Sequence, residues 1–144
     1  MTVTIAHQRR KPLPALSLLI EGCAEKGMDV SAGGAIYNYS GPQAVGVGTV
    51  ADGLSAIKQL VFDEKKVTGG EFLTALLSNW EGYEWLHALV NSEKVHHYGN
   101  DDAYADELTV FGSDTYCKHV ENRPTAHGGV FLPGVYSVTA NVGL

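Results

Sequence analysis

A thiol and a carboxylate lie two positions apart in the segment Gly22-Cys23-Ala24-Glu25. A thiolate or thiyl group in this pattern could attack a substrate while Glu25 accepts a proton. The same cysteine also falls on the apolar face of a predicted helix, where a small buried thiol is the commoner role. Taken alone, the pattern favours a buried Cys23 over a catalytic one.

Two glycine-rich stretches have a composition that could hold a phosphate group. They are Gly33-Gly34-Ala35-Ile36-Tyr37-Asn38 and Gly46-Val47-Gly48. Neither is followed by the Gly-Lys-Ser/Thr of a P-loop, and the second lacks the third glycine and the acidic partner of a dinucleotide fingerprint. The glycines therefore indicate tight turns and close backbone packing instead of a phosphate site.

Six histidines raise the question of a metal site. His96 and His97 are adjacent, so their side chains point to opposite sides of a strand, or about 100° apart on a helix. The other candidates show no zinc-type spacing with one another: His87, His119, His127 and Cys117. We therefore expect no metal-ligating residues, with the histidines at the surface or in hydrogen bonds.

The formal net charge of −6 argues against a nucleic acid or an anionic membrane as a partner, since both require a basic surface. The short basic cluster Arg9-Arg10-Lys11 is expected to be a solvated terminus. The sequence contains no secretory signal pattern and no apolar run of membrane-spanning length. We expect a cytoplasmic protein with Cys23 and Cys117 reduced, a disulfide between them being the alternative.

The apolar periodicity predicts mostly helices, with one glycine-rich region of loop and short strand between 31 and 50. Asp52 is a plausible N-cap for a helix, and Asn100-Asp101-Asp102 for another that runs to about Val120. The acidic residues near that second start lack the spacing of a calcium loop. The helices are expected over 15–26, 52–61, 71–80, 82–91 and 100–120.

The segment Val135–Val142 is predicted to be a strand because it is rich in β-branched residues. Alternation along a strand places Tyr136, Val138 and Ala140 on one face, with Ser137 and Thr139 on the other. Both faces carry apolar or small side chains, as in a strand buried on both sides. A chain with many helices and so little sheet is expected to be part of a larger α/β structure.

Seven stretches, in order along the chain, together resemble the glycyl radical enzyme superfamily, the group of pyruvate formate-lyase and its dehydratase and lyase relatives. The likeness is greater to the dehydratase and C–X lyase branch than to pyruvate formate-lyase itself. The matching stretches are Ser17–Gly27, Gly33–Asn38, Gly41–Gln43, Ala51–Lys58, Leu60–Glu64, Tyr98–Asp102 with Asp106, and Pro133–Val142.

This resemblance implies an α/β fold, the helix-rich portion of the ten-stranded α/β barrel of glycyl radical enzymes. Residues 1–144 would then be a partial pyruvate formate-lyase-like domain that lacks the catalytic cysteine loop and the C-terminal radical-glycine domain. The surroundings of Cys23 resemble a segment downstream of the catalytic loop, so we assign no catalytic residue in this chain. Gly53 stands where family members usually have Ser, a difference with no clear consequence.

The resemblance further implies that the chain is a fragment of a radical dehydratase or C–C/C–X lyase of anaerobic metabolism, inactive alone. The alternative is a non-catalytic interaction or spare-part module that associates with a full-length glycyl radical enzyme. The family uses a protein glycyl radical installed by a radical-SAM activating enzyme, and we expect no cofactor in this chain itself. The implied partners are a small polar substrate, the activating enzyme and a second copy in a homodimer. The matching family residues line the substrate pocket, so Tyr136, Val138 and Ala140 are the predicted substrate-binding residues.

Overall fold

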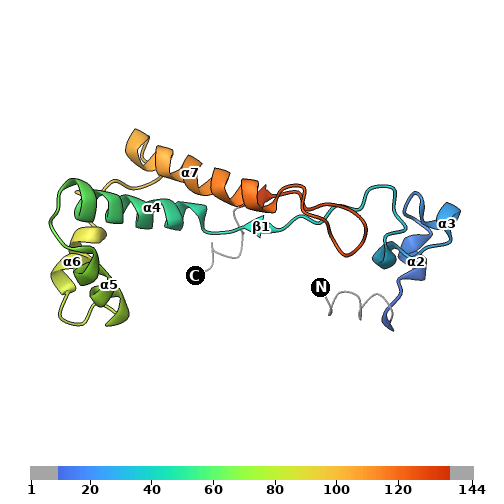
Figure 1. Cartoon of the computed structure of the whole chain (residues 1–144), viewed down its shortest axis with the longest axis horizontal. Helices are drawn as coiled ribbons and strands as arrows, with labels where there is room; N and C mark the ends of the chain where they lie inside the picture. Colours follow the sequence, from blue (N-terminus) through green and yellow to red (C-terminus); the bar gives the residue numbers. More distant parts are fainter. Residues whose placement is uncertain (1–9, 137–144) are drawn as a thin grey trace. The chain divides into compact units, whose positions relative to one another are not determined.

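The computed structural model describes residues 10–136, which fall into two compact units. Residues 45–115 form what we call the helical unit, and residues 10–44 with 116–136 form the strand unit. The boundary between Thr115 and Tyr116 falls inside the long helix α7, Ala103–Val120 (Figure 1).

The helical unit contains most of the regular structure. Helix α4, Val47–Ile57, continues directly into a π-helix, η2, Lys58–Asp63, whose wider turn is seen in a hydrogen bond from the Glu64 amide to the Gln59 carbonyl, 2.8 Å long. Helices α5, Gly69–Leu77, and α6, Glu84–Val90, follow, and then the first part of α7. The predicted helices over 71–80, 82–91 and 100–120 are confirmed, with bounds that differ by a few residues.

The core of the helical unit is apolar. Its fully buried members include Leu60 and Leu86, and the ring of Phe72 meets Trp80 edge-on at 6.1 Å between centroids. Helix α5, which contributes Phe72 and Ala75 to this core, begins with a capping box. The Thr68 hydroxyl accepts from the Glu71 amide, and the Glu71 carboxylate accepts from the Thr68 amide. The residues of the core are Ala56, Leu60, Val67, Phe72, Ala75, Leu86 and Val95.

The predicted start of the second helix at Asp52 is wrong. Helix α4 begins five residues earlier, at Val47, after Gly46 with a φ of 83°. Asp52 therefore lies inside the helix, and its carboxylate accepts a hydrogen bond from the Tyr98 amide at 2.7 Å. A carboxylate that could cap a helix is used here to hold a loop distant in sequence.

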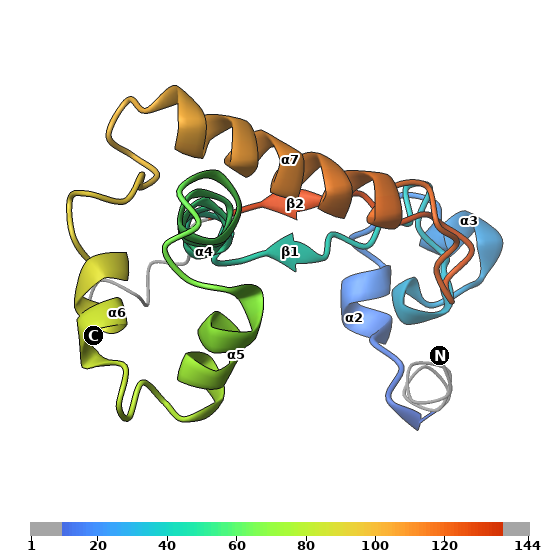
Figure 2. The same ribbon diagram turned by 60° about the vertical axis from the view of Figure 1, so that its left-hand side comes forward.

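The strand unit is built from short pieces. These are α2, Pro14–Ser17, α3, Cys23–Lys26, the 3-10 turn η1, Val30–Ala32, and the strands β1, Gln43–Ala44, and β2, Gly134–Val135. The two strands pair in parallel, with Gln43 opposite Gly134 and Ala44 opposite Val135 (Figure 2). A parallel bridge between Ser40 and Phe131 extends the pairing toward the start of β1.

The predicted continuous helix over 15–26 is broken in the structure. Helix α2 ends at Ser17, and Gly22, with a φ of 94°, precedes α3. This left-handed conformation is accessible to glycine but ends a right-handed helix. Gly27 closes α3 with a φ of 59°, directly after the predicted helix end at residue 26.

The strand predicted over 135–142 can be compared with the structure only at its beginning. Strand β2 ends at Val135, and residues 137–144 lie outside the described residues. Within residues 10–136 the combination of helices with a parallel strand pair agrees with the predicted α/β class. In that same part of the chain, no helix is long and apolar enough to cross a membrane.

Candidate functional site

Tyr136 lies directly after β2 and is the predicted substrate-binding residue that the structure describes. Its amide donates to the Ala44 carbonyl at 3.4 Å, so the pairing with β1 continues to this residue. Its side chain is 57% exposed. Val138 and Ala140 lie outside the described residues, so the expected common face of the three is still a prediction.

The beginning of β2 is held by one carbonyl that accepts two hydrogen bonds. The Pro42 carbonyl accepts from the Gly134 amide at 3.1 Å and from the Tyr116 hydroxyl at 2.7 Å. The last turns of α7 are thereby tied to the edge on which β1 and β2 pair. Sequence reasoning missed this link, because nothing near Tyr116 in the sequence indicates a partner 74 residues away.

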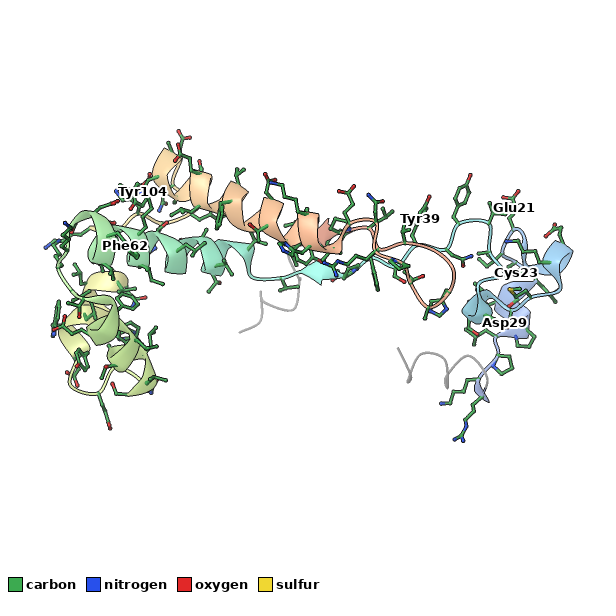
Figure 3. The ribbon with its side chains drawn as sticks, in the orientation of Figure 1. Glu21, Cys23, Asp29, Tyr39, Phe62 and Tyr104 are labelled. Atoms are coloured by element: carbon green, nitrogen blue, oxygen red, sulfur yellow. The ribbon has the colours of Figure 1, made fainter. Side chains whose placement is uncertain are left out.

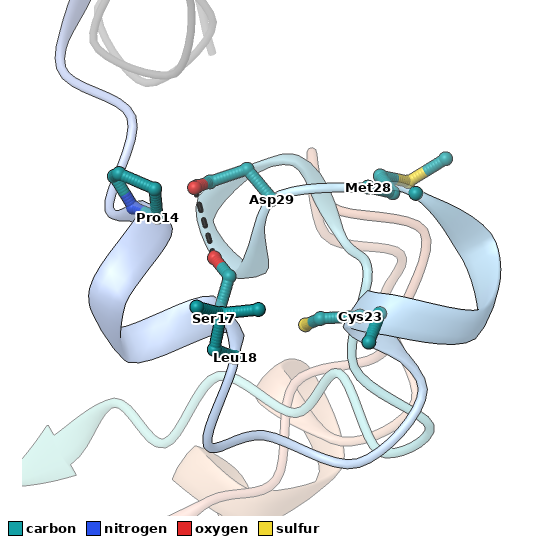
Figure 4. Close-up of a pocket in the computed structure, with 8 residues that line it drawn as sticks. Pro14, Ser17, Leu18, Cys23, Met28 and Asp29 are labelled. Carbon is teal, nitrogen blue, oxygen red and sulfur yellow. Dashed lines mark hydrogen bonds between the residues drawn. The ribbon is translucent and has the colours of Figure 1, made fainter.

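Cys23 is a buried thiol, only 2% exposed, at the start of α3. Its sulfur points toward α2 (Figure 4). The carboxylate of Glu25 is used to accept from the Gly22 amide at 3.0 Å, and so caps α3. The Cys-x-Glu pattern thus has a structural role here, and both Cys23 and Cys117 are free thiols.

A pocket of about 460 Å³ lies between α2 and α3 in the strand unit (Figure 4). The apolar atoms of Leu18 and Met28 contribute to its lining, together with the buried Cys23. One carboxylate, Asp29, faces it from the loop after α3. The lining residues are Pro14, Ser17, Leu18, Cys23, Ala24, Gly27, Met28 and Asp29.

Asp29 joins three segments of the strand unit. One oxygen accepts from the Leu13 amide at 2.7 Å and from the Ser17 hydroxyl at 2.9 Å, and the other accepts from the amide and the hydroxyl of Ser31. The hydrogen bond from the Ser31 hydroxyl is the largest of the effects that lower the pKa of Asp29 from 3.8 to about 2. With four donors on its two oxygens, Asp29 is a structural link and has little capacity left to bind a ligand.

Five polar side chains gather in the helical unit where η2 meets the first turn of α7. Tyr104 lies at the start of α7 (Figure 3). Its hydroxyl donates to Asp63 at 2.6 Å, and Lys58 lies 3.1 Å from the same carboxylate and 3.9 Å from the centre of the Tyr104 ring. The His96 ring is stacked on the same Tyr104 ring, with 4.4 Å between the ring centroids, and its Nδ1 lies 2.5 Å from Asp102.

These five side chains satisfy one another. Hydrogen bonding to Tyr104 is the main cause that raises the pKa of Lys58 and lowers that of Asp63, and His96 is the main cause that lowers the pKa of Asp102. Asp102 also caps α7 by accepting from the Tyr104 amide at 3.0 Å, which confirms the predicted cap. The cluster therefore fastens α7 to η2, and its geometry indicates structure instead of catalysis.

The two glycines of the Gly33-Gly34 pair serve close packing, as predicted. A Cβ at Gly33 would overlap the carbonyl of His127, and a Cβ at Gly34 would overlap the carbonyl of Met28. Among the residues described here, no three His, Cys, Asp or Glu side chains are grouped so that they could hold a metal ion.

Comparisons of the sequence with known proteins all indicate the same family. A family model described as pyruvate formate lyase-like matches residues 1–144. The chain is 55% identical over 139 residues to (2S)-3-sulfopropanediol dehydratase from Klebsiella oxytoca, and 42% identical over 134 residues to trans-4-hydroxy-L-proline dehydratase from Clostridioides difficile, covering 96% and 93% of this chain.

Solved structures agree with this result. The glycerol-bound form of the B12-independent glycerol dehydratase from Clostridium butyricum superimposes on 93% of this chain with a TM-score of 0.84 and 40% identity. In each of these comparisons the chain spans only 17% of the length of the other protein.

Proposed function

Because the chain belongs to the pyruvate formate lyase-like family, whose members include glycyl radical enzymes, we propose that it supplies a substrate-facing strand to a radical dehydratase. The relatives are glycyl radical dehydratases and lyases, and the chain corresponds to part of such an enzyme. The observation that carries the proposal is the position of Tyr136 at the exposed end of the parallel strand pair.

The substrate class follows from the relatives. Their names refer to a sulfonated propanediol, a hydroxylated proline and glycerol, each a small molecule that carries a hydroxyl group. We therefore propose a small hydroxylated substrate that loses water. The Tyr136 hydroxyl can donate or accept a hydrogen bond to such a substrate, while a small residue at 140 leaves it room.

Cys23 and Glu25 do not fit the radical-carrying roles of the reaction. Cys23 is 2% exposed, and the Glu25 carboxylate beside it is bonded to the Gly22 amide. We place the thiyl cysteine and the radical glycine in parts of the enzyme that this chain does not include, and derive no radical step through residues 1–144. We further propose that the complete enzyme is activated by a radical-SAM enzyme, forms a homodimer and is located in the cytoplasm.

The test is to place this chain in a complete enzyme. In the sulfopropanediol dehydratase from K. oxytoca, this chain would replace the stretch that it matches, and the hybrid would be activated under anaerobic conditions. Ala140→Leu should block substrate binding with little change in melting temperature. Tyr136→Phe should weaken binding by about 1–3 kcal/mol if its partner is left buried and unpaired.

The control variants lie on the opposite face of the same strand. Ser137→Ala and Thr139→Ala should leave turnover unchanged, because alternate side chains of a strand point away from each other. In an ordinary core strand Ala140→Leu would instead destabilise the protein by about 1–3 kcal/mol through overpacking. A lower melting temperature with intact substrate affinity would therefore contradict the proposal.

A non-catalytic interaction module is the second candidate, and the exposed apolar side chains favour it. Leu18 and Leu19, which are adjacent in the sequence, are 75% and 82% exposed and form an apolar surface that a partner could cover. Mixing the chain with the intact K. oxytoca enzyme distinguishes the two candidates. A spare-part module should bind the intact enzyme, whereas a portion of an enzyme should bind only a version from which the matching stretch has been removed.

The chain by itself should be inactive in either case. Anaerobic incubation with a matched activating enzyme, followed by electron paramagnetic resonance, should give no glycyl radical signal on residues 1–144. A glycyl doublet on this chain would overturn the assignment of the radical glycine to another part of the enzyme.

A further inference from the structure

Gly134 lies two residues before Tyr136, so the two residues are on the same face of the strand. The Tyr136 ring is folded back over the Cα of Gly134. A Cβ placed at Gly134 would overlap Cε2 of that ring and come within 2.9 Å of Cζ and 3.1 Å of Cδ2. The ring thus occupies the space that any side chain at position 134 would need.

The backbone under the ring is fixed independently of it. Gly134 is paired with Gln43, and its amide donates to the Pro42 carbonyl that also accepts from the Tyr116 hydroxyl. The ring therefore rests on a segment whose position is set by β1 and by the end of α7.

Gly134 is not required by the backbone. Its φ lies outside the left-handed range in which glycine is favoured, and the three atoms nearest to an added Cβ all belong to the Tyr136 ring. The contrast with Gly129 is clear, because a Cβ there would overlap the backbone carbonyl of Asn38. A side chain at 134 would therefore meet the half-exposed Tyr136 ring first, and not the backbone.

We propose that Gly134 is a positioning residue for Tyr136: the absence of a side chain at position 134 lets the ring fold back over the strand and thereby sets the direction of its hydroxyl toward the substrate. This inference rests on the proposed function, since it concerns the same substrate-facing strand. Position 134 thus helps to set which substrates can bond to Tyr136.

The direction of the ring can be measured on the 144-residue chain itself. The seven tyrosines can be labelled with 3-fluorotyrosine, and the Tyr136 signal in the fluorine spectrum assigned by its loss in Tyr136→Phe. Gly134→Ala should shift the Tyr136 signal and leave the other tyrosine signals in place. The matched control is Gly41→Ala in the same unit, where a Cβ would meet only the Leu132 carbonyl oxygen at 3.9 Å, an ordinary contact.

A Tyr136 signal that does not move in Gly134→Ala would overturn the inference. So would a change spread over all tyrosine signals together with a lower melting temperature, because Gly134 would then support the fold and not one ring. The Gly41→Ala control separates both outcomes from the general effect of adding a methyl group near the strands.

The functional consequence is tested by a double-mutant cycle in the hybrid enzyme. Gly134→Ala should lower kcat/KM by up to about 100-fold through misplacement of the hydroxyl. In a Tyr136→Ala background the same change should have no further effect, because no ring remains to be displaced. Two losses that simply multiply would show that Gly134 acts without Tyr136, and would overturn the inference.

Failure of the proposed function would look different. Tyr136→Ala would then leave turnover unchanged, whatever the effect of Gly134→Ala on the fluorine signal. The fluorine spectrum decides whether Gly134 sets the direction of the Tyr136 ring. The activity of Tyr136→Ala decides whether that ring faces the substrate.

Discussion

Leu60 and Leu86 are completely buried in the helical unit, whereas the strand unit, over its described residues, buries no apolar side chain larger than Cys23. The strand unit is held instead by backbone groups in close approach, at Gly33, Gly34 and Gly129, and by the four hydrogen bonds that Asp29 accepts. One unit is thus stabilised mainly by removing apolar surface from water, and the other by contacts that only small residues permit.

This difference shows where each unit is vulnerable. Loss of volume should damage the helical unit, because its core side chains interdigitate. Gain of volume should damage the strand unit, because there backbone lies against backbone. Substitutions of opposite kinds in the two units test the distinction.

The largest effect is expected from Leu86→Ala in the helical unit. Leu86 is 0% exposed, and its truncation removes apolar contacts and leaves a cavity, at a cost of about 2–5 kcal/mol. Urea denaturation measures the loss, and hydrogen exchange should show it at the amides of residues 45–115. Equal loss of protection over residues 10–44 would show that the two units do not differ as described.

Gly34→Ala should have the next largest effect, in the strand unit. The added Cβ would overlap the Met28 carbonyl and lie 3.0 Å from the Cys23 sulfur, so we expect destabilisation of about 1–3 kcal/mol. Cys23→Ala in the same chain should not restore stability, because the main overlap is with backbone. Restoration by Cys23→Ala, measured by thermal melting, would instead identify a side-chain clash.

The effect of Asp29 should depend on pH. Its pKa is lowered from 3.8 to about 2 in the folded chain, so the carboxylate stabilises the fold fully above pH 4. This stabilisation is lost progressively as the pH falls from about 4 through about 2, and it is gone only below the folded pKa, where both states carry the proton. The melting temperatures of the unchanged chain and of Asp29→Asn should therefore differ at pH 7 and converge below about pH 2, and a difference independent of pH would contradict this account.

The smallest effect is expected from Gly53→Ala, and it should have the opposite sign to that of Gly34→Ala. Gly53 lies inside α4, and no atom comes within 4 Å of an added Cβ. Alanine in place of glycine in a helix interior should stabilise the helical unit by about 0.5–1 kcal/mol. Thermal melting checks the sign, and a loss of stability would mean that this position has a partner that the helix geometry does not reveal.

The same contrast explains what the sequence could predict. Helices α5, α6 and α7 follow from apolar spacing within ten or twenty residues, which is a local signal. The prediction that Asp52 caps a helix is wrong because its carboxylate binds the Tyr98 amide instead. That amide is 46 residues away, and nothing in the sequence near Asp52 indicates it. The break at Gly22 was missed for a related reason, since an apolar pattern does not show which glycine adopts a positive φ.

The candidate site, too, could be predicted only in part. The period of two along a strand places Tyr136 on one face with Val138 and Ala140, and the latter two positions stay a prediction. Two features of the site could not be predicted from the sequence. One is the contact between the Tyr136 ring and Gly134, and the other is the Pro42 carbonyl that accepts hydrogen bonds from both Gly134 and Tyr116. Asp29 and the cluster around Tyr104 were missed because their partners come from separate segments.

The π-helical turn of η2 has a consequence for insertions and deletions in this region. A turn closed between Gln59 and Glu64 contains one residue more than an α-helical turn, so it advances the phase of every later side chain by about 100°. Leu60, inside this turn, reaches the core, and Asp63, at its end, accepts from the Tyr104 hydroxyl. Deleting a single residue between 58 and 63 would restore a regular helix and turn these side chains away from their partners, so the chain length of this turn is constrained more strictly than its composition.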